Sequence, residues 1–170
     1  MLVRRLLALT PVLALVLAGC GNSGGSGSTP TSTPAIKAGP TKEISGPWTG
    51  KLTQAGIAPF RIAAAVDPDG TGLVAYTGLD CAGKWKLTSR DGPRYVFTEE
   101  IDRGEGGECK GTGTVHLSRT ALGDLSYRFE GGGVTSSGVL MRGSLRALIA
   151  IFRQTGMNIT RATVTDTIPK

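Results

Sequence analysis

The stretch RYVFTEEID, residues 94–102, decides the fold of this 170-residue chain. Successive side chains of an extended chain point to opposite faces, so the stretch divides into two sets. One face carries Tyr95, Phe97, Glu99 and Ile101, and the other carries Val96, Thr98, Glu100 and Asp102. Aromatic and β-branched residues in this alternation predict a strand with two distinct faces.

Similar alternating runs lie on both sides of this strand, and turn signals such as Asp67-Pro68-Asp69-Gly70 and Asp91-Gly92 separate them. We predict eight strands, at residues 48–54, 60–66, 73–76, 84–89, 94–102, 112–118, 125–130 and 135–142. The side chains expected to face inward include Phe60, Ile62, Ala64, Val66, Trp85 and Leu87.

The short links between consecutive strands favour an all-β fold, a small lipocalin-like antiparallel up-and-down β-barrel of about eight strands with a short C-terminal helix. Closure into a barrel removes the exposed edges that invite aggregation. The interior of such a barrel has room for side chains or for one small ligand. A sandwich of two sheets is the alternative.

The C-terminal segment, residues 143–170, contains the predicted helix. Ser144 is its expected N-cap, and Leu145, Leu148, Ile149 and Phe152 form an apolar stripe that ends before Gly156. We expect this helix to pack over one end of the barrel. The alternative is an interfacial helix that contacts anionic lipid through the flanking Arg142, Arg146 and Arg153. Residues 157–170 are expected to add a strand at 159–164 or to remain irregular.

The N-terminus has the layout of a bacterial lipoprotein signal, residues 1–19. Arg4 and Arg5 precede an apolar stretch, residues 6–17, that is shorter than the roughly 20 residues needed to span a bilayer. The run Leu17-Ala18-Gly19-Cys20 then supplies small residues for cleavage and a thiol for a diacylglyceryl group. Cys20 is therefore the predicted lipid attachment site, and acyl chains such as palmitate would anchor the protein to the extracytoplasmic face of the cell membrane. The alternative is an ordinary secretory signal.

Residues 20–45 are predicted to form a linker between the lipidated cysteine and the β domain, residues 46–142. Residues 21–33 contain only Gly, Asn, Ser, Thr and Pro, which have no apolar side chains to offset the entropy of ordering. Gly21-Asn22-Ser23-Gly24-Gly25 matches the G-x-S-x-G motif of hydrolases. That motif requires a strand before it and a helix after it, so we interpret the match as accidental.

The charge distribution argues against a nucleic-acid partner. The formal charge of +6 includes Arg4 and Arg5, and without them 17 basic and 13 acidic residues remain. Between Thr41 and Met141 there are 11 basic and 12 acidic residues, so the β domain is close to neutral. Nucleic-acid binding requires clustered basic residues in the folded part, and the sequence shows none there.

Cys81 and Cys109 remain once Cys20 is assigned to the lipid. Two cysteines on the oxidising side of the membrane predict a disulfide. Closing a loop of about 29 residues would stabilise the fold by roughly 3 to 4 kcal/mol. A thiolate metal or redox site is the alternative, which the lack of C-x-x-C spacing and of a nearby histidine disfavours.

Several of these runs together resemble a small extracytoplasmic β domain of actinobacterial lipoproteins, which also forms the exported part of some membrane serine/threonine protein kinases. The matching segments are residues 46–50, 78–87, 95–101, Cys109 with 113–117, 125–129 and 138–142. The resemblance covers residues 46–142. It implies the β fold and the Cys81–Cys109 bridge, it supplies no catalytic residue, and it supports a sensing or binding role.

The candidates for chemistry are few. His116, the only histidine, would have to serve any Ser-His-Asp triad, but its place between Val115 and Leu117 in a strand favours a solvated side chain. Glu99, Glu100, Asp102, Glu105 and Glu108 form an acidic run that could hold Ca²⁺ or meet a basic partner, although a solvated hairpin end is favoured. Asp67-Pro68-Asp69-Gly70 is interpreted as a turn, and the glycine-rich residues 111–113 and 131–133 as turns or curved strand.

We therefore expect a non-catalytic binding or sensing lipoprotein without a metal or cofactor, partnered by the membrane through Cys20 and by a small ligand or an envelope protein. An envelope structural or protein-interaction lipoprotein is the alternative, and a hydrolase is less favoured. The sequence identifies no ligand-binding residue. A barrel filled by its own side chains would weigh against small-ligand binding.

Overall fold

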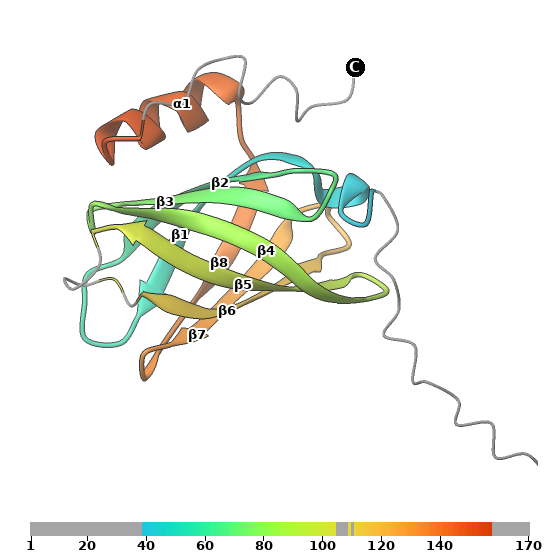
Figure 1. The fold of residues 1–170 in the computed structure, drawn as a ribbon, viewed down its shortest axis with the longest axis horizontal. Coiled ribbons are helices and arrows are strands. Elements are labelled where there is room, and N and C mark those ends of the chain that lie inside the picture. Colours follow the sequence, from blue (N-terminus) through green and yellow to red (C-terminus); the bar gives the residue numbers. More distant parts are fainter. Residues whose placement is uncertain (1–38, 105–108, 110, 158–170) are drawn as a thin grey trace, which may run out of the picture. The chain divides into compact units, whose positions relative to one another are not determined.

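The computed structural model describes residues 39–104, 109 and 111–157, and these form a closed antiparallel β-barrel with one helix on its outer wall (Figure 1). The elements in chain order are η1 (Lys42–Ile44), β1 (Gly46–Gln54), β2 (Phe60–Val66), β3 (Thr71–Thr77), β4 (Cys81–Asp91), β5 (Arg94–Arg103), β6 (Thr112–Arg119), β7 (Leu125–Gly131), β8 (Val134–Arg142) and α1 (Leu145–Gln154). The eight predicted strands are all present. Several extend beyond the predicted limits, most clearly β4, which begins at Cys81.

The sheet closes by pairing of the first strand with the last. Strands β1 to β8 follow one another around the barrel, and β1 pairs with β8 in the register Trp48↔Arg142 and Leu52↔Gly138. Each strand thus has two antiparallel neighbours and no edge is left to attract another chain. The barrel prediction is confirmed, and the alternative two-sheet sandwich is wrong.

The core lies inside the barrel and consists of the alternate side chains of every strand. The predicted inward residues Phe60, Ile62, Ala64, Val66, Trp85 and Leu87 are all buried, and so is the face of β5 that carries Tyr95, Phe97, Glu99 and Ile101. The register of β5 against β6 places Phe97 opposite Val115, so apolar residues face one another across the ladder. The period-two pattern of the sequence therefore assigns the interior correctly.

One end of the barrel is closed by η1. Ile44 is fully buried, and the indole nitrogen of Trp48 on β1 donates a hydrogen bond of 2.7 Å to its carbonyl oxygen. Glu43 accepts an ion pair from Arg90 at 2.9 Å and a hydrogen bond from the Tyr95 hydroxyl at 3.1 Å. Residues 41–45, which the sequence assigned to the linker, thus belong structurally to the closed end of the barrel.

Helix α1 packs against the outer wall of the barrel rather than over one of its ends. The side chain of Ser144 accepts a hydrogen bond of 3.1 Å from the backbone nitrogen of Ala147, which confirms the predicted N-cap. Leu148 and Phe152 are fully buried against the outer faces of β2 and β3, where Ala63 and Ala75 lie. The small alanine side chains leave room for the helix to approach the sheet.

Candidate functional site

The end of the barrel opposite η1 contains a small cavity that opens toward the barrel mouth. Its volume is about 30 Å³. A cavity needs roughly 10 to 15 Å³ to hold one water molecule, so this one has room for about two. The cavity is lined by Gln54, Phe60, Tyr76, Leu79, Glu99, Ile101, Cys109, Tyr127, Phe129, Val134 and Ser136. The interior of the described barrel is thus largely filled by side chains, which weighs against a bulky ligand, and it leaves a small, mostly apolar cavity near the mouth.

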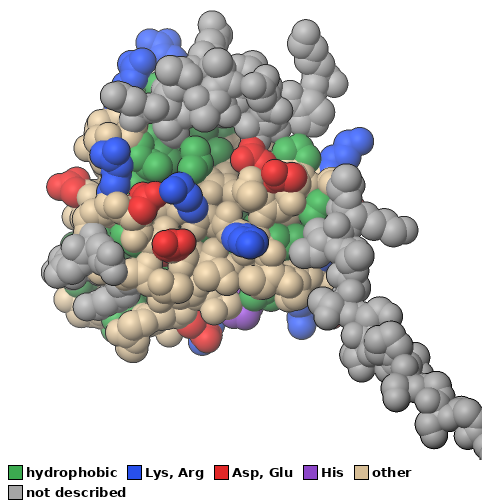
Figure 2. Space-filling model, in the orientation of Figure 1, with side chains coloured by type: hydrophobic (Ala, Val, Ile, Leu, Met, Phe, Trp, Pro, Cys, Tyr) green, Lys and Arg blue, Asp and Glu red, His purple; other side chains and the backbone are tan. Residues whose placement is uncertain are grey.

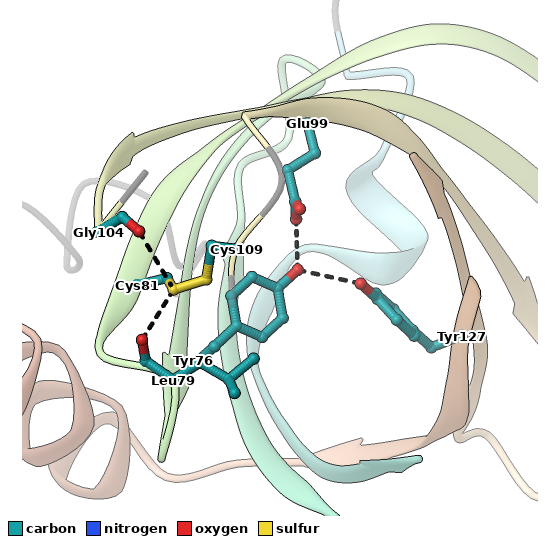
Figure 3. Close-up of a disulfide and its surroundings, with 7 residues drawn as sticks. All are labelled: Tyr76, Leu79, Cys81, Glu99, Gly104, Cys109 and Tyr127. Atoms are coloured by element: carbon teal, nitrogen blue, oxygen red, sulfur yellow. Dashed lines mark hydrogen bonds between the residues drawn. A yellow bond between two sulfur atoms is a disulfide. The ribbon is translucent and has the colours of Figure 1, made fainter. Parts of the chain in front are cut away.

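A buried carboxylate forms the polar centre of this site. Glu99 on β5 is 2% exposed, and its Oε2 accepts a hydrogen bond of 2.7 Å from the indole nitrogen of Trp85. The hydroxyl of Tyr76 on β3 donates a second hydrogen bond to the same oxygen (Figure 3). Tyr127 on β7 lies 3.0 Å from the Tyr76 hydroxyl, oxygen to oxygen. Side chains of four strands, β3, β4, β5 and β7, therefore converge on one point inside the barrel.

The direction of the hydrogen bonds follows from the number of protons. A phenol has one O–H, and the Tyr76 proton is directed at Glu99, so the Tyr127 hydroxyl must donate to the Tyr76 oxygen. The chain of donors thus runs from Tyr127 through Tyr76 to Glu99. Both O–H groups thus point along the chain toward Glu99, in the direction that stabilises a negative charge on its carboxylate.

Burial governs the protonation of this cluster. Desolvation raises the pKa of Glu99 above its ordinary value, while the hydrogen bonds from Trp85 and Tyr76 lower it in part. Burial also raises the pKa of Tyr76 and of Tyr127 well above their usual range, and the nearby charge of Glu99 adds to both shifts. Both phenols therefore remain protonated donors at neutral pH.

Aromatic rings surround the carboxylate. Trp85 stacks on Tyr127 with ring centroids 6.2 Å apart, and Phe60 meets Tyr76 edge to face at 6.0 Å. Phe60, Tyr76, Tyr127 and Phe129 line the cavity and give the site aromatic walls around a polar centre. This composition, mostly apolar with a few convergent polar groups, is typical of small-ligand sites.

Two glycines fix the position of the Phe129 ring. A Cβ atom on Gly113 would lie 2.1 Å from Phe129, and one on Gly131 would lie 2.6 Å from it. The ring therefore occupies the space left free by both glycines, one on β6 and one on β7. The glycine-rich segments predicted as turns or curved strand thus include two positions, 113 and 131, that shape the cavity wall.

The predicted disulfide is present beside the cavity. Cys81 at the start of β4 is bonded to Cys109, with a Cα–Cα distance of 6.4 Å (Figure 3). Cys109 lines the cavity, and Cys81 belongs to the same buried core. The bridge thus ties β4 to the segment between β5 and β6 at the open end of the barrel.

His116 does not belong to this interior cluster. Its side chain is exposed on the outer face of β6, opposite Val96 of β5 and Arg128 of β7. Ser118, Ser126 and Asp91 line the same shallow surface depression. Within residues 39–104, 109 and 111–157, no hydrogen bond joins the imidazole to a serine or a carboxylate, so the described chain forms no triad around it.

The acidic run predicted as a solvated group is divided between the two faces of β5. Glu99 points into the barrel, whereas Glu100 and Asp102 are exposed on the outside. Asp102 forms an ion pair of 2.9 Å with Lys84 on β4. Glu105 and Glu108 lie outside the described residues. The interpretation of Glu99 as solvated is therefore wrong, because strand alternation places it inside.

The Asp67-Pro68-Asp69-Gly70 turn is confirmed. The backbone nitrogen of Gly70 donates to the carbonyl of Asp67 at 3.2 Å, and Gly70 has a φ of +95°. Asp69 Oδ1 accepts from both the backbone and the hydroxyl of Thr71, at 2.9 and 2.7 Å. Among the residues that the structure describes, no three His, Cys, Asp or Glu side chains gather as metal ligands.

The outer surface carries charges of both signs. Figure 2 shows Lys and Arg interspersed with Asp and Glu on the face in view, in keeping with the near-neutral composition of the β domain. The large apolar side chains exposed in the described part of the chain are Leu122, Val139 and Met141. In the same part of the chain, no helix has the length and apolar character that a membrane crossing requires.

Sequence reasoning missed Glu99 as a site residue, together with its partners Tyr76, Trp85 and Tyr127. A signal was available, since Glu99 shares the inward face with Tyr95, Phe97 and Ile101. An acidic residue on an otherwise apolar face indicates a buried carboxyl group, and such a group is a candidate functional residue. Its partners come from distant strands, and their register could not be read from the sequence.

Cys20 and the predicted linker up to residue 38 lie outside the described residues, as do the predicted strand at 159–164 and the rest of the tail beyond Met157. No protein-family model and no curated protein matches this chain.

Proposed function

We propose that this protein is a membrane-anchored extracytoplasmic lipoprotein whose barrel is a non-catalytic binding module. The small cavity at the open end, with Glu99 at its centre, is the proposed binding site. The chain would belong with the small β domains of actinobacterial lipoproteins that its segments resemble. Cys20 would carry the lipid, and the linker would hold the barrel away from the headgroups.

The observation that carries this proposal is the polar cluster inside an apolar barrel. A carboxylate that is 2% exposed costs stability, and a core of the same shape built from apolar residues would fold without that cost. Residues that violate the rules of folding tend to mark functional positions. Glu99 lines a cavity that opens toward the barrel mouth, so a ligand has access to it.

The size of the cavity limits what the module can bind. About 30 Å³ has room for a small head group and not for a drug-sized molecule, whose sites span hundreds of Å³. Leu79 and Val134 are only partly buried and pack against the core at the mouth, where the remainder of a ligand would emerge. The module would therefore recognise a small molecule, or one end of a longer one.

Filling the cavity tests this function directly. Ser136 on β8 is buried and lines the cavity, whereas its neighbour Ser137 is exposed on the outer face. The full chain, purified from host membranes, would be compared with S136L and S137L by native mass spectrometry, before and after incubation with a small-molecule extract of the host cell. We expect a bound small molecule on the wild type and on S137L, and none on S136L.

Two results would contradict the proposed function. One is a wild-type protein that carries no small molecule under any of these conditions. The other is a ligand that binds S136L as well as it binds the wild type, which would place the site elsewhere. Near-ultraviolet circular dichroism of S136L shows whether the barrel has kept its native packing.

A further inference from the structure

Glu99 has no cationic partner among the described residues. Among the residues that the structure describes, Glu99 is the one buried Asp, Glu, Lys, Arg or His; the other buried polar residues are Thr41, Ser45, Ser136 and Thr155. Buried charges in proteins are normally paired with an opposite charge or bound to a metal. When Glu99 is ionised, the site therefore has a net negative charge that a cationic ligand would neutralise.

The two oxygens of the Glu99 carboxylate have different surroundings. Oε2 accepts the hydrogen bonds of Trp85 and Tyr76. Oε1 accepts no hydrogen bond from any described residue, and Glu99 lines the cavity. The fully buried side-chain oxygens without a partner in the described chain are those of Asp67, Thr77 and Thr120, so Oε1 is not one of them. A hydrogen-bond donor that enters the cavity would meet Glu99, and an ionised carboxylate favours a cationic donor.

The walls of the cavity suit the same kind of ligand. Phe60, Tyr76, Tyr127 and Phe129 all line it, and the faces of such rings attract cations. The hydroxyls of the two tyrosines are engaged in the chain of hydrogen bonds that ends at Glu99. The site thus offers one negative charge and several aromatic faces.

Other ligand classes fit this arrangement less well. A divalent cation such as Ca²⁺ takes six to eight oxygen ligands, and the described residues contain no cluster of three His, Cys, Asp or Glu side chains. An anion would be repelled by Glu99. A neutral alcohol could donate one hydrogen bond but would leave the charge uncompensated. An ammonium group supplies three donors and the opposite charge, and it fits a cavity of about 30 Å³.

We propose that the cavity binds the primary ammonium group of a small amine, with Glu99 as its counter-ion and the surrounding aromatic rings as a collar around its first carbon atoms. This inference rests on the proposed function, because it names the ligand class of the same site. The rest of the amine extends toward the barrel mouth between Leu79 and Val134.

The test compares three ligands of the same chain length that differ in charge: n-butylammonium, 1-butanol and butyrate. Binding to the full chain would be measured by isothermal titration calorimetry at neutral pH and constant ionic strength. Three variants accompany the wild type: E99Q, which removes the charge, E99D, which retains it, and E100Q, which removes a charge from the outer face of the same strand. We expect butylammonium to bind the wild type and E100Q at least about tenfold more tightly than butanol, which corresponds to about 1.4 kcal/mol.

E99Q should lose this preference, and E99D should keep most of it. A second test needs no substitution, because it measures butylammonium binding to the wild type at different pH values. Butylammonium remains cationic between pH 4 and 8, since alkylamines titrate near pH 10.4 as lysine does. The groups facing Glu99, namely Tyr76, Trp85 and Tyr127, do not ionise in that range. Affinity for butylammonium should therefore fall by at least about tenfold as low pH protonates Glu99.

The outcomes separate the two proposals. If butanol or butyrate binds as tightly as butylammonium, or if E99Q binds the amine unchanged, the ammonium inference is wrong while a binding site in the cavity remains. If the preference for the amine is the same at low and neutral pH, Glu99 is not the counter-ion and the inference is again overturned. If none of the three ligands binds the wild type, the ammonium inference is overturned, whereas the proposed function is decided by the comparison of the wild type with S136L and S137L.

Discussion

The guanidinium of Arg142 lies over the indole of Trp48, with its central carbon 4.0 Å from the ring centroid. Arg142 is the last residue of β8 and Trp48 belongs to β1, so the contact spans the seam at which the barrel closes. The same guanidinium donates to the carbonyl oxygens of Ser45 and Glu43 beside η1. One side chain therefore holds the two ends of the sheet and the cap together.

Arg142→Met should destabilise the protein by about 1 to 3 kcal/mol, because it removes the cation–π contact and leaves two carbonyl groups without their donor. The measurement is urea unfolding of the full chain. Arg146→Met on the exposed face of α1 is the matched control and should change stability by less than about 0.5 kcal/mol. Equal effects of the two substitutions would show that the contact over Trp48 contributes nothing.

Helix α1 should be held to the barrel by its buried face alone. Leu148 is fully buried against the alanines of β2 and β3, whereas its neighbour Ile149 is only partly buried and lies outside that cluster. Leu148→Ala should therefore cost about 2 to 4 kcal/mol, and Ile149→Ala about 1 kcal/mol or less. Urea unfolding monitored by circular dichroism measures both. A larger loss for Ile149→Ala would contradict the observed orientation of the helix.

The Cys81–Cys109 bridge should contribute on the order of 3 to 4 kcal/mol, because it closes a loop with a sequence separation of 28 residues. The double substitution of both cysteines by serine should lower the midpoint of urea unfolding accordingly. Adding a thiol reductant should destabilise the wild type and leave the double variant unaffected. A wild type whose unfolding is insensitive to a reductant that demonstrably opens the bridge would contradict this.

Glu99 should make stability depend on pH in a direction opposite to that of most acidic residues. Burial raises its pKa above the unfolded value, near 4.5, so the unfolded chain ionises first as the pH rises. The contribution of Glu99 to the free energy of unfolding is thus largest below the pKa of the unfolded state and is lost as the pH rises through the pKa of the folded state. The loss is about 1.4 kcal/mol for each pH unit between these two pKa values. The stability of E99Q relative to the wild type should therefore increase with pH.

Urea unfolding at a series of pH values from 4 to 8 checks the direction of this change. The quantity to follow is the change with pH of the difference in free energy of unfolding between E99Q and the wild type, because the cost of burying the amide is the same at every pH. E100Q is the matched control, since Glu100 is exposed and its removal should give a nearly flat difference. A difference for E99Q that falls with rising pH would mean that the folded pKa of Glu99 is lowered.

Lipid attachment at Cys20 is tested separately from the barrel. The wild-type chain should partition with the membrane fraction, and its N-terminal peptide should carry the mass of a diacylglyceryl cysteine. Cys20→Ala should abolish both. A wild-type chain that is exported without acylation would instead support the ordinary secretory signal.

The strands could be read from the sequence because alternation is a local property. Phe97 and Glu99 fall on one face whatever the rest of the chain does, and that face proved to be the interior. The turn at Asp67-Pro68-Asp69-Gly70 and the N-cap at Ser144 are equally local, and both were predicted correctly. Each of these features depends on residues only a few positions apart.

The features that escaped prediction depend on long-range register or on the outer wall. Tyr76 and Trp85 reach Glu99, and Tyr127 reaches Tyr76, only because the five strands from β3 to β7 pair with the offsets that they have. The position of α1 was signalled by Ala63 and Ala75, small apolar residues on an outer face where polar ones are usual. The burial of Ile44 in a three-residue helix could not be anticipated from a segment that begins as a polar linker.

The most direct test of the central claim uses the two tryptophans as reporters. The indole N–H of Trp85 donates to Glu99, whereas that of Trp48 donates to the carbonyl of Ile44 at the closed end of the barrel. In ¹H–¹⁵N spectra of the full chain, n-butylammonium should shift the indole signal of Trp85 saturably and leave that of Trp48 in place. A Trp85 signal that stays unchanged, or one that shifts equally in E99Q, would contradict the account of Glu99 as the centre of the binding site.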